Sequence, residues 1–118
     1  MPLSSSPCRG ERSVEDHGGR AVLLKHNANQ RYATDAVGCA LIRRFAQKAA
    51  CPLQDFAVKA DSGCGTTIGP ITAAGLGLKT VDVGPPQLSM HSCREIMGAD
   101  DVYYAVKTFR AASRRTPT

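Results

Sequence analysis

The stretch GCGTTIGP (residues 63–70), followed by PPQLSMHSCRE (residues 85–95), decides the predicted fold of this chain. An apolar unit, AAGLGLKTVDVG (residues 73–84), separates the two motifs, and glycine or proline stands at every corner. Two glycines in three residues let a backbone turn sharply and bring its amides close to a ligand. We interpret the region as a strand end, a tight loop, a helix, a strand and a second loop. His91, near the end of that second loop, is placed to present a metal ligand.

A strand, a short helix and a strand after a tight loop predict a βαβ unit. We assign its strands to FAVKA (56–60) and LKTVDV (78–83). The residues expected to cap, start and end the helix between them are Thr66 or Thr67, Pro70, Gly75 and Gly77. Such a unit implies parallel pairing with a right-handed crossover. Sites in open α/β sheets lie beyond the carboxyl ends of strands, from which both motif loops leave.

The upstream part of the chain predicts a buried strand and an amphipathic helix. RAVLLKH (20–26) is short and apolar, as a buried strand is. Thr34 or Asp35 can cap the following helix, which ends before Pro52 because a residue preceding proline favours extended geometry. The residues expected on its inner face are Val37, Leu41, Phe45 and Ala49.

The downstream part predicts a helical turn and a last helix. Ser92 and Glu95 have the spacing of a capping box, which predicts a helical turn that begins at Ser92. Asp100 or Asp101 is expected to cap the final helix. The residues expected on the inner face of that helix are Val102, Val106 and Phe109.

Composition is that of one small soluble domain with a basic end. The chain has 118 residues, of which 42% are hydrophobic and 21% charged, and its formal net charge is +5. The positive charges after residue 106 are Lys107, Arg110, Arg114 and Arg115. No aromatic residue follows Phe109, so these charges have no stacking platform for single strands, and we expect no nucleic-acid partner.

Cysteine usage and hydropathy predict a cytoplasmic protein. The five cysteines form no CxxC pair, which argues against a disulfide framework and against a cysteine zinc site, so reduced thiols are expected. No run of 18 apolar residues occurs, and the N-terminus lacks the apolar region of a secretory signal. We therefore expect no membrane partner.

Four side chains are candidates for chemistry. His91 is the best single candidate, although a hydrolytic zinc site needs at least three protein ligands, and His17 and His26 are distant in sequence. Cys64 is either a nucleophile with His91 or His17 as its base, or, as we prefer, a small buried residue between two glycines.

Lys25 and Tyr32 flank the first loop. A lysine at a strand end can pair with an anionic ligand, and a tyrosine hydroxyl can donate to a developing oxyanion, although surface residues of these types need no such role. No lysine follows the glycine loop as in a phosphate-binding loop, so nucleotide binding is not expected.

Three segments resemble the C-terminal part of aspartyl aminopeptidase: NQRYATDAV (29–37), CPLQDFAVKADSGCGTTIGPI (51–71) and LGLKTVDVGPPQLSMHSCRE (76–95). That family consists of dinuclear zinc exopeptidases that remove acidic residues from peptide N-termini. The resemblance implies an α/β, three-layer sandwich fragment with a mixed, mainly parallel sheet. It also implies two zinc ions per site in the complete enzyme, peptides with an acidic N-terminus as substrates, and a homo-oligomer, which is a dodecamer in the family.

The resemblance assigns roles residue by residue. His91 matches the last metal ligand of the family, Lys25 matches a lysine that binds substrate, and Tyr32 matches a tyrosine near the scissile carbonyl. The other zinc ligands and the general base of the family lie upstream, and nothing in residues 1–17 matches them. The family's separate dimerisation domain is also absent.

The expected organisation follows from these departures. Residues 1–17 form a divergent or disordered segment, residues 18–112 the C-terminal part of the catalytic domain, and residues 113–118 a basic flexible tail. We expect the 118-residue chain alone to be inactive. The alternatives are an inactive interaction module that associates with full-length subunits, and a basic binding module that uses the C-terminal arginines.

Overall fold

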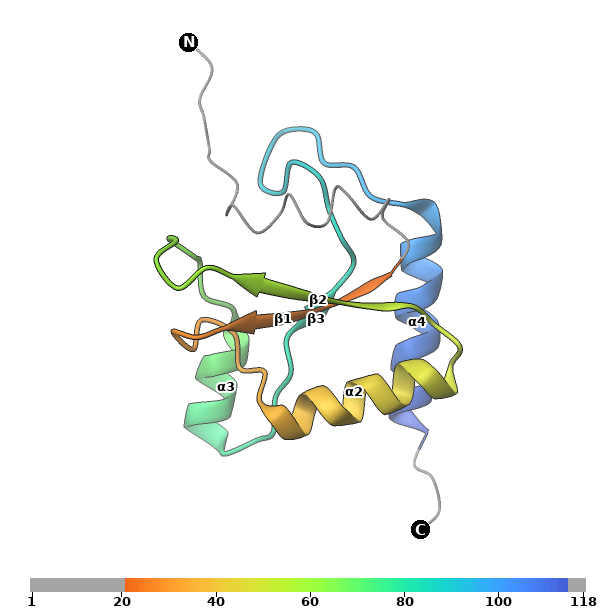
Figure 1. The fold of residues 1–118 in the computed structure, drawn as a ribbon, viewed down its shortest axis with the longest axis horizontal. Helices are drawn as coiled ribbons and strands as arrows, with labels where there is room; N and C mark the ends of the chain where they lie inside the picture. The colour runs from red at the N-terminus through yellow and green to blue at the C-terminus, as the bar shows by residue number, and fades with distance from the viewer. Residues whose placement is uncertain (1–20, 115–118) are drawn as a thin grey trace.

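The structure of the protein is a computed structural model that describes residues 21–114 (Figure 1). The predicted divergent segment of residues 1–17, with His17, lies outside the described residues. Residues 115–118 of the predicted basic tail lie outside them as well.

A mixed three-stranded sheet forms the centre of the fold. Its strands are β1 (Val22–Asn27), β2 (Leu53–Val58) and β3 (Val83–Gly84), in the order β2-β1-β3. β1 and β2 pair in parallel from Val22↔Leu53 to Asn27↔Val58, whereas β3 pairs antiparallel with β1 through two residues. The predicted α/β class and the mixed, mainly parallel sheet are confirmed.

The predicted βαβ unit of residues 56–83 is wrong, because the parallel crossover joins β1 to β2 instead. Of the predicted strand 78–83 only its last residue is in a strand, β3, and that strand runs along β1 in the opposite direction. Gly77 ends the preceding helix with a φ of 63°, and Val81 then lies against Gly38 of the crossover helix. The returning chain therefore reaches the open edge of β1, which is the central strand.

The crossover helix α2 (Ala36–Lys48) starts as predicted but is rotated from the predicted face. The Asp35 side chain accepts a hydrogen bond from the Gly38 N–H at 2.6 Å, which is the expected N-cap. Val37, expected inside, is 51% exposed, whereas Gly38 and Ala46 are buried. Small residues on the buried side let Val81 approach the helix backbone, and this contact decides the rotation.

Helix α3 (Ile68–Leu76) has the predicted caps. The Thr67 hydroxyl accepts from the Gly69 N–H at 3.3 Å, and Gly77 closes the other end in the left-handed conformation. The helix leaves large apolar side chains in solvent, and Ile68 is 81% exposed. In Figure 1, α3 stands beside the end of the sheet rather than across it.

Helix α4 (Ala99–Ser113) differs most from its prediction. Gly98 is the N-cap, and the predicted inner residues Val102, Val106 and Phe109 are exposed. The buried residues are Asp101, Ala105 and Thr108. Asp101 causes this rotation, since its carboxylate accepts hydrogen bonds at 3.0 Å from the Ala21 N–H and from the Gly98 N–H.

The segment before α4 is a loop rather than the predicted helical turn at Ser92. An isolated bridge between Leu88 and Ile96 closes it, with backbone hydrogen bonds in both directions. Figure 1 shows this loop on one side of the sheet and α2 on the other. No helix among residues 21–114 is long and apolar enough to cross a membrane.

The core follows the alternation of β1. Val22 and Leu24 are buried on the side of α2, and α4 packs against α2 and β1. Leu23 faces the other way and joins a buried cluster with Tyr32, Phe56 and Val58. That second face carries the candidate functional residues.

Candidate functional site

The loops that follow the two parallel strands meet beyond the carboxyl ends of those strands, where sites in open α/β sheets are expected. The Asn29 side chain donates to the Ala60 carbonyl at 2.8 Å, which joins the loop after β1 to the loop after β2. The Arg31 carbonyl accepts from the Thr67 N–H at 3.4 Å and from the Thr66 hydroxyl at 3.3 Å. The GCGTT loop is therefore fixed against the segment that leads to Tyr32.

A polar cleft of about 380 Å³ lies between these loops. Asn27, Arg31, Ser62, Cys64 and Thr66 contribute to its lining. The Asn27 side-chain oxygen accepts from the Asn29 N–H at 2.8 Å, and the side-chain nitrogen of Asn27 is buried with no hydrogen-bond partner among residues 21–114. A buried donor of this kind favours an acceptor group on a ligand or on a further segment of protein.

The structure brings the two predicted substrate-binding residues together. The Lys25 ammonium lies 5.6 Å from the centre of the Tyr32 ring, within the range of a cation–π contact. Tyr32 is 9% exposed and packs with Leu23, Phe56 and Val58, so its ring position is set by the core. Its hydroxyl lies 3.4 Å from the sulfur of Cys64.

Asp82 supports this pair and was missed by the sequence analysis. The Asp82 carboxylate accepts a hydrogen bond from the Ala33 N–H at 2.7 Å, and the Asp82 N–H donates to the Thr34 hydroxyl at 3.0 Å. The Asp82 carbonyl accepts from the Lys25 N–H at 2.9 Å. One residue therefore holds the strand that carries Lys25 and the segment that follows Tyr32. An aspartate inside an apolar strand-like run (TVDV, 80–83) was the available signal.

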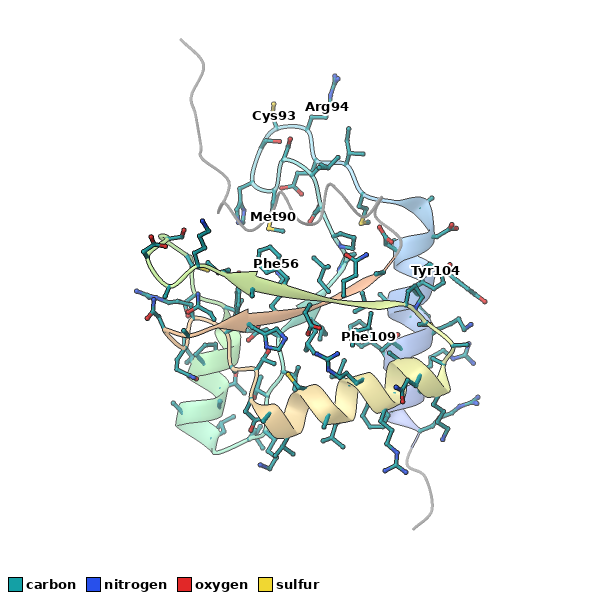
Figure 2. The ribbon with its side chains drawn as sticks, in the orientation of Figure 1. Phe56, Met90, Cys93, Arg94, Tyr104 and Phe109 are labelled. Carbon is teal, nitrogen blue, oxygen red and sulfur yellow. The ribbon has the colours of Figure 1, made fainter. Side chains whose placement is uncertain are left out.

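His91 lies on the loop between β3 and α4 and is exposed. Its φ is 69°, and its N–H donates to the Glu95 carboxylate at 2.5 Å. Glu95 thus closes the loop onto His91 rather than capping a helix at Ser92. Figure 2 shows Cys93 and Arg94 at the tip of this loop, pointing away from the sheet.

The described residues do not by themselves form a zinc site. No group of three or more His, Cys, Asp or Glu side chains within residues 21–114 is arranged to hold a metal ion. His26 is not available to His91, because its ring pairs with Asp55 at 2.8 Å on the α2 side of the sheet. His91 therefore stands as a single candidate ligand.

Cys64 has the surroundings of a packed thiol rather than of a catalytic nucleophile. Its described hydrogen-bond partners are the Tyr32 hydroxyl and the Gly65 carbonyl, at 3.4 and 3.2 Å, and neither is a base for a thiol. The sulfur packs against the cluster of Tyr32 and its neighbours. These contacts argue against the nucleophile, but Cys64 is only partly buried and lines the cleft, so it is not the fully buried residue that the sequence interpretation preferred.

An ionic network that the sequence did not predict lies on the opposite face of the sheet. Arg43 donates to both carboxylate oxygens of Asp55 at 2.7 and 2.8 Å, and His26 pairs with the same group. Partial burial acts to raise the Asp55 pKa, but the hydrogen bonds from Arg43 and His26 outweigh it and lower that pKa. Burial raises the pKa of the neighbouring Cys39 thiol, so that thiol stays protonated. The network joins α2 to both parallel strands.

Comparison with known proteins identifies the family. The family model described as aminopeptidase I zinc metalloprotease (M18) matches residues 9–112. The chain belongs to this family. The M18 match extends over both motif loops and over the cleft between the strand ends.

Curated M18 relatives are close in sequence but much longer. The chain is 56% identical over 95 residues to a probable aspartyl aminopeptidase of Ricinus communis, which covers 80% of this chain and 19% of that protein. It is 48% identical over 101 residues to aspartyl aminopeptidase 1 of Schizosaccharomyces pombe, and the match covers 86% of this chain and 21% of that protein. The chain therefore spans about a fifth of the length of these relatives.

Solved M18 structures share the fold. A cryo-EM structure of the Ape4 and Nbr1 complex superposes with a TM-score of 0.75 at 50% identity, covering 78% of this chain and 18% of that chain. The mApe1 dodecamer of S. cerevisiae superposes with a TM-score of 0.66 at 37% identity, and the match covers 77% of this chain and 19% of that chain.

Proposed function

We propose that this chain is the C-terminal part of an M18 zinc aminopeptidase that removes N-terminal aspartate or glutamate from peptides. The observation that carries the proposal is the contact between the Lys25 ammonium and the Tyr32 ring, in a chain whose M18 match extends over both residues. The identity of 56% to a probable aspartyl aminopeptidase supports the acidic specificity.

The three predicted site residues have distinct roles in this proposal. Lys25 supplies a cation for the acidic side chain of the substrate, since an ammonium pairs well with a carboxylate. Tyr32 donates its hydroxyl toward the scissile carbonyl as negative charge develops on the oxygen. His91 is one ligand of a two-zinc site whose remaining ligands and general base belong to upstream family sequence. Bound zinc would activate water and polarise the carbonyl.

Exposed apolar faces support the view that this chain is a fragment of a larger fold. Ile68, Ile71 and Leu76 on α3, and Val106 and Phe109 on α4, are all exposed. Faces of this kind are normally buried within a domain or an interface. Because the chain spans about a fifth of its relatives, we propose that the rest of the family fold covers them.

The specificity is tested in a chimera with the Ricinus communis relative. The chimera replaces the matching 95-residue segment of that relative with the segment of this chain. We expect it to cleave an N-terminal aspartyl substrate, and Lys25→Glu to lower kcat/KM by at least about 100-fold, or ~2.7 kcal/mol. The control is Lys59→Glu, an exposed lysine after β2 with no predicted contact to substrate. A Lys25→Glu chimera with unchanged preference for aspartate would contradict the role of Lys25.

The metal assignment is tested separately. We expect the chimera to bind two zinc ions per subunit and His91→Ala to lose one of them, as measured by elemental analysis after dialysis. Ser92→Ala changes a neighbouring exposed residue and serves as the control. The 118-residue chain with added zinc is expected to show no turnover, because it lacks the other ligands. Normal zinc content in His91→Ala would remove His91 from the site.

The proposal includes assembly and location. The mApe1 structure of S. cerevisiae is a dodecamer, and we propose a homo-oligomer for the complete protein. Light scattering of the chimera measures this directly, and a monomer would contradict it. We also propose a cytoplasmic location, which fits the absence of a disulfide among the cysteines that the structure describes, at positions 39, 51, 64 and 93.

A further inference from the structure

We propose that Cys64, which lines the cleft, is a positioning residue for Tyr32, and that its thiol helps to set the direction of the phenol hydroxyl. The proposal rests on the proposed function, because it takes Tyr32 as the group that faces the scissile carbonyl. The Cys64 sulfur lies 3.4 Å from the Tyr32 oxygen and also lines the cleft. Cys64 thus connects the lining of the cleft to the Tyr32 hydroxyl.

The loop around Cys64 is built to hold the sulfur in this place. A Cβ atom added at Gly63 or Gly65 would meet nothing within 4 Å among residues 21–114. Cys64 instead packs inward against the buried cluster that contains Tyr32. The hydrogen bonds from Thr66 and Thr67 to the Arg31 carbonyl fix the same loop beside residue 32.

The chemistry of the pair explains why the contact matters. The core fixes the Tyr32 ring, but a hydroxyl still rotates about its C–O bond unless a neighbour selects one direction. The thiol is a weak donor and a weak acceptor, so it can hold the phenol without competing strongly with a substrate oxygen. With the Lys25 ammonium 5.6 Å from the ring centre, the phenol has a cation beside its ring and a sulfur at its hydroxyl.

The first test is spectroscopic and uses the 118-residue chain. The chain has three tyrosines, so ¹³C labelling of the ring carbon that carries the hydroxyl yields three NMR signals. Tyr32→Phe assigns the signal of interest. We expect Cys64→Ala to shift the Tyr32 signal, Cys64→Ser to return it toward the wild-type position, and Cys93→Ala, at an exposed cysteine, to leave it unchanged. An unmoved Tyr32 signal in Cys64→Ala would overturn the proposal.

The second test is kinetic and uses the chimera, which also keeps the proposal testable where a variant of the isolated chain fails to fold. We expect Cys64→Ala to lower kcat about threefold to tenfold with little change in KM, and Cys64→Ser to recover most of the loss. In Tyr32→Phe, the further change Cys64→Ala should have almost no effect, because the two residues act through one group. Independent effects that multiply would overturn the proposal.

The two tests separate this inference from the proposed function. If Tyr32→Phe leaves kcat of the chimera unchanged, the role of Tyr32 in the proposed function fails. The NMR result then still decides whether Cys64 orients the phenol. If Tyr32→Phe lowers kcat but Cys64→Ala does not, the proposed function stands and the positioning role of Cys64 is wrong.

Discussion

The Asp82 carboxylate accepts a hydrogen bond from the Ala33 N–H at 2.7 Å, across 49 positions of sequence. This bond joins the segment beside Tyr32 to the residue that precedes β3. The carbonyl of the same Asp82 accepts from the Lys25 N–H at 2.9 Å. The distance between the two proposed substrate-binding residues therefore depends on a residue that forms no part of the cleft lining among the described residues.

Asp82→Ala is expected to lower the free energy of unfolding by about 1–3 kcal/mol, because the Ala33 N–H loses a charged acceptor. Urea denaturation followed by circular dichroism measures the change. Asp61→Ala, at an exposed loop position, is the matched control and should change stability by less than about 0.5 kcal/mol. Equal effects of the two substitutions would argue against a supporting role for Asp82.

Gly69→Ala and Gly75→Ala should have opposite effects, although both positions lie in α3. A Cβ at Gly69 would come within 2.5 Å of an Asp82 carboxylate oxygen, so a cost of about 1–3 kcal/mol is expected. A Cβ at Gly75 would meet nothing within 4 Å in the described part of the chain, and alanine should stabilise the helix by about 0.5–1 kcal/mol. Thermal or urea unfolding of both variants gives the comparison. A neutral Gly69→Ala would show that Asp82 moves away easily.

Asp101 should make the chain less stable as pH rises above the acid range. Burial raises its pKa from the ordinary 3.8, and the hydrogen bonds from Ala21 and Gly98 offset this effect only in part. For an acid whose folded pKa is raised, the favourable contribution is complete below the unfolded pKa and is lost as pH rises through the folded pKa. The difference in unfolding free energy between wild type and Asp101→Asn should therefore shrink with rising pH. Urea titrations from pH 3.5 upward test this, and a difference independent of pH would contradict it.

Asp55 should show the opposite pH dependence and only a small effect. Its lowered folded pKa means that its contribution is present above the ordinary value of 3.8 and is lost as pH falls through the folded pKa. About half of the side chain is exposed, so solvent screens the pairs with Arg43 and His26. We expect Asp55→Ala to cost less than about 1 kcal/mol near neutral pH, and the cost to fall in 1 M salt. A cost that does not respond to salt would indicate packing rather than charge.

Lysine substitutions at Ile68, Ile71 and Leu76 test the proposal that α3 is covered in the complete protein. In the 118-residue chain all three side chains are exposed, so each change should alter stability by less than about 0.5 kcal/mol and reduce self-association. In the chimera the same changes should cost about 2 kcal/mol or more each, because they place charge in a buried interface. Denaturation and light scattering measure both. Similar, small effects in the two proteins would mean that α3 faces solvent in both.

Local sequence patterns predicted the caps of α2 and α3 correctly, whereas the predicted caps at Asp100 or Asp101 and at Ser92 were wrong. Asp35, Thr67 and Gly77 are caps as expected, because capping depends on one side chain, or on one φ angle, and on the backbone next to it. The loop that carries Cys64 lies at the carboxyl ends of the parallel strands for a similar reason: its glycines and the apolar run before it are contiguous in sequence.

The patterns failed where long-range contacts compete with periodicity. On α4, periodicity favoured Val102, Val106 and Phe109 as the buried face, but two hydrogen bonds that the Asp101 carboxylate accepts turn the helix the other way. On α2, Val81 approaches Gly38 from a segment far away in sequence. At Glu95, the capping-box spacing was present, but its carboxylate binds the His91 N–H inside a loop.

The sequence by itself determined the family, the caps of α2 and α3, and the identity of Lys25, Tyr32 and His91 as candidate residues, because each of these depends on short contiguous motifs. Only the tertiary structure decided that β3 returns antiparallel along β1, that Asp82 ties Lys25 to the segment beside Tyr32, and that Cys64 meets the Tyr32 hydroxyl. These contacts join residues 32 or more positions apart. Their formation depends on which packing of the whole chain buries the most apolar surface while satisfying its polar groups, and no local pattern contains that information.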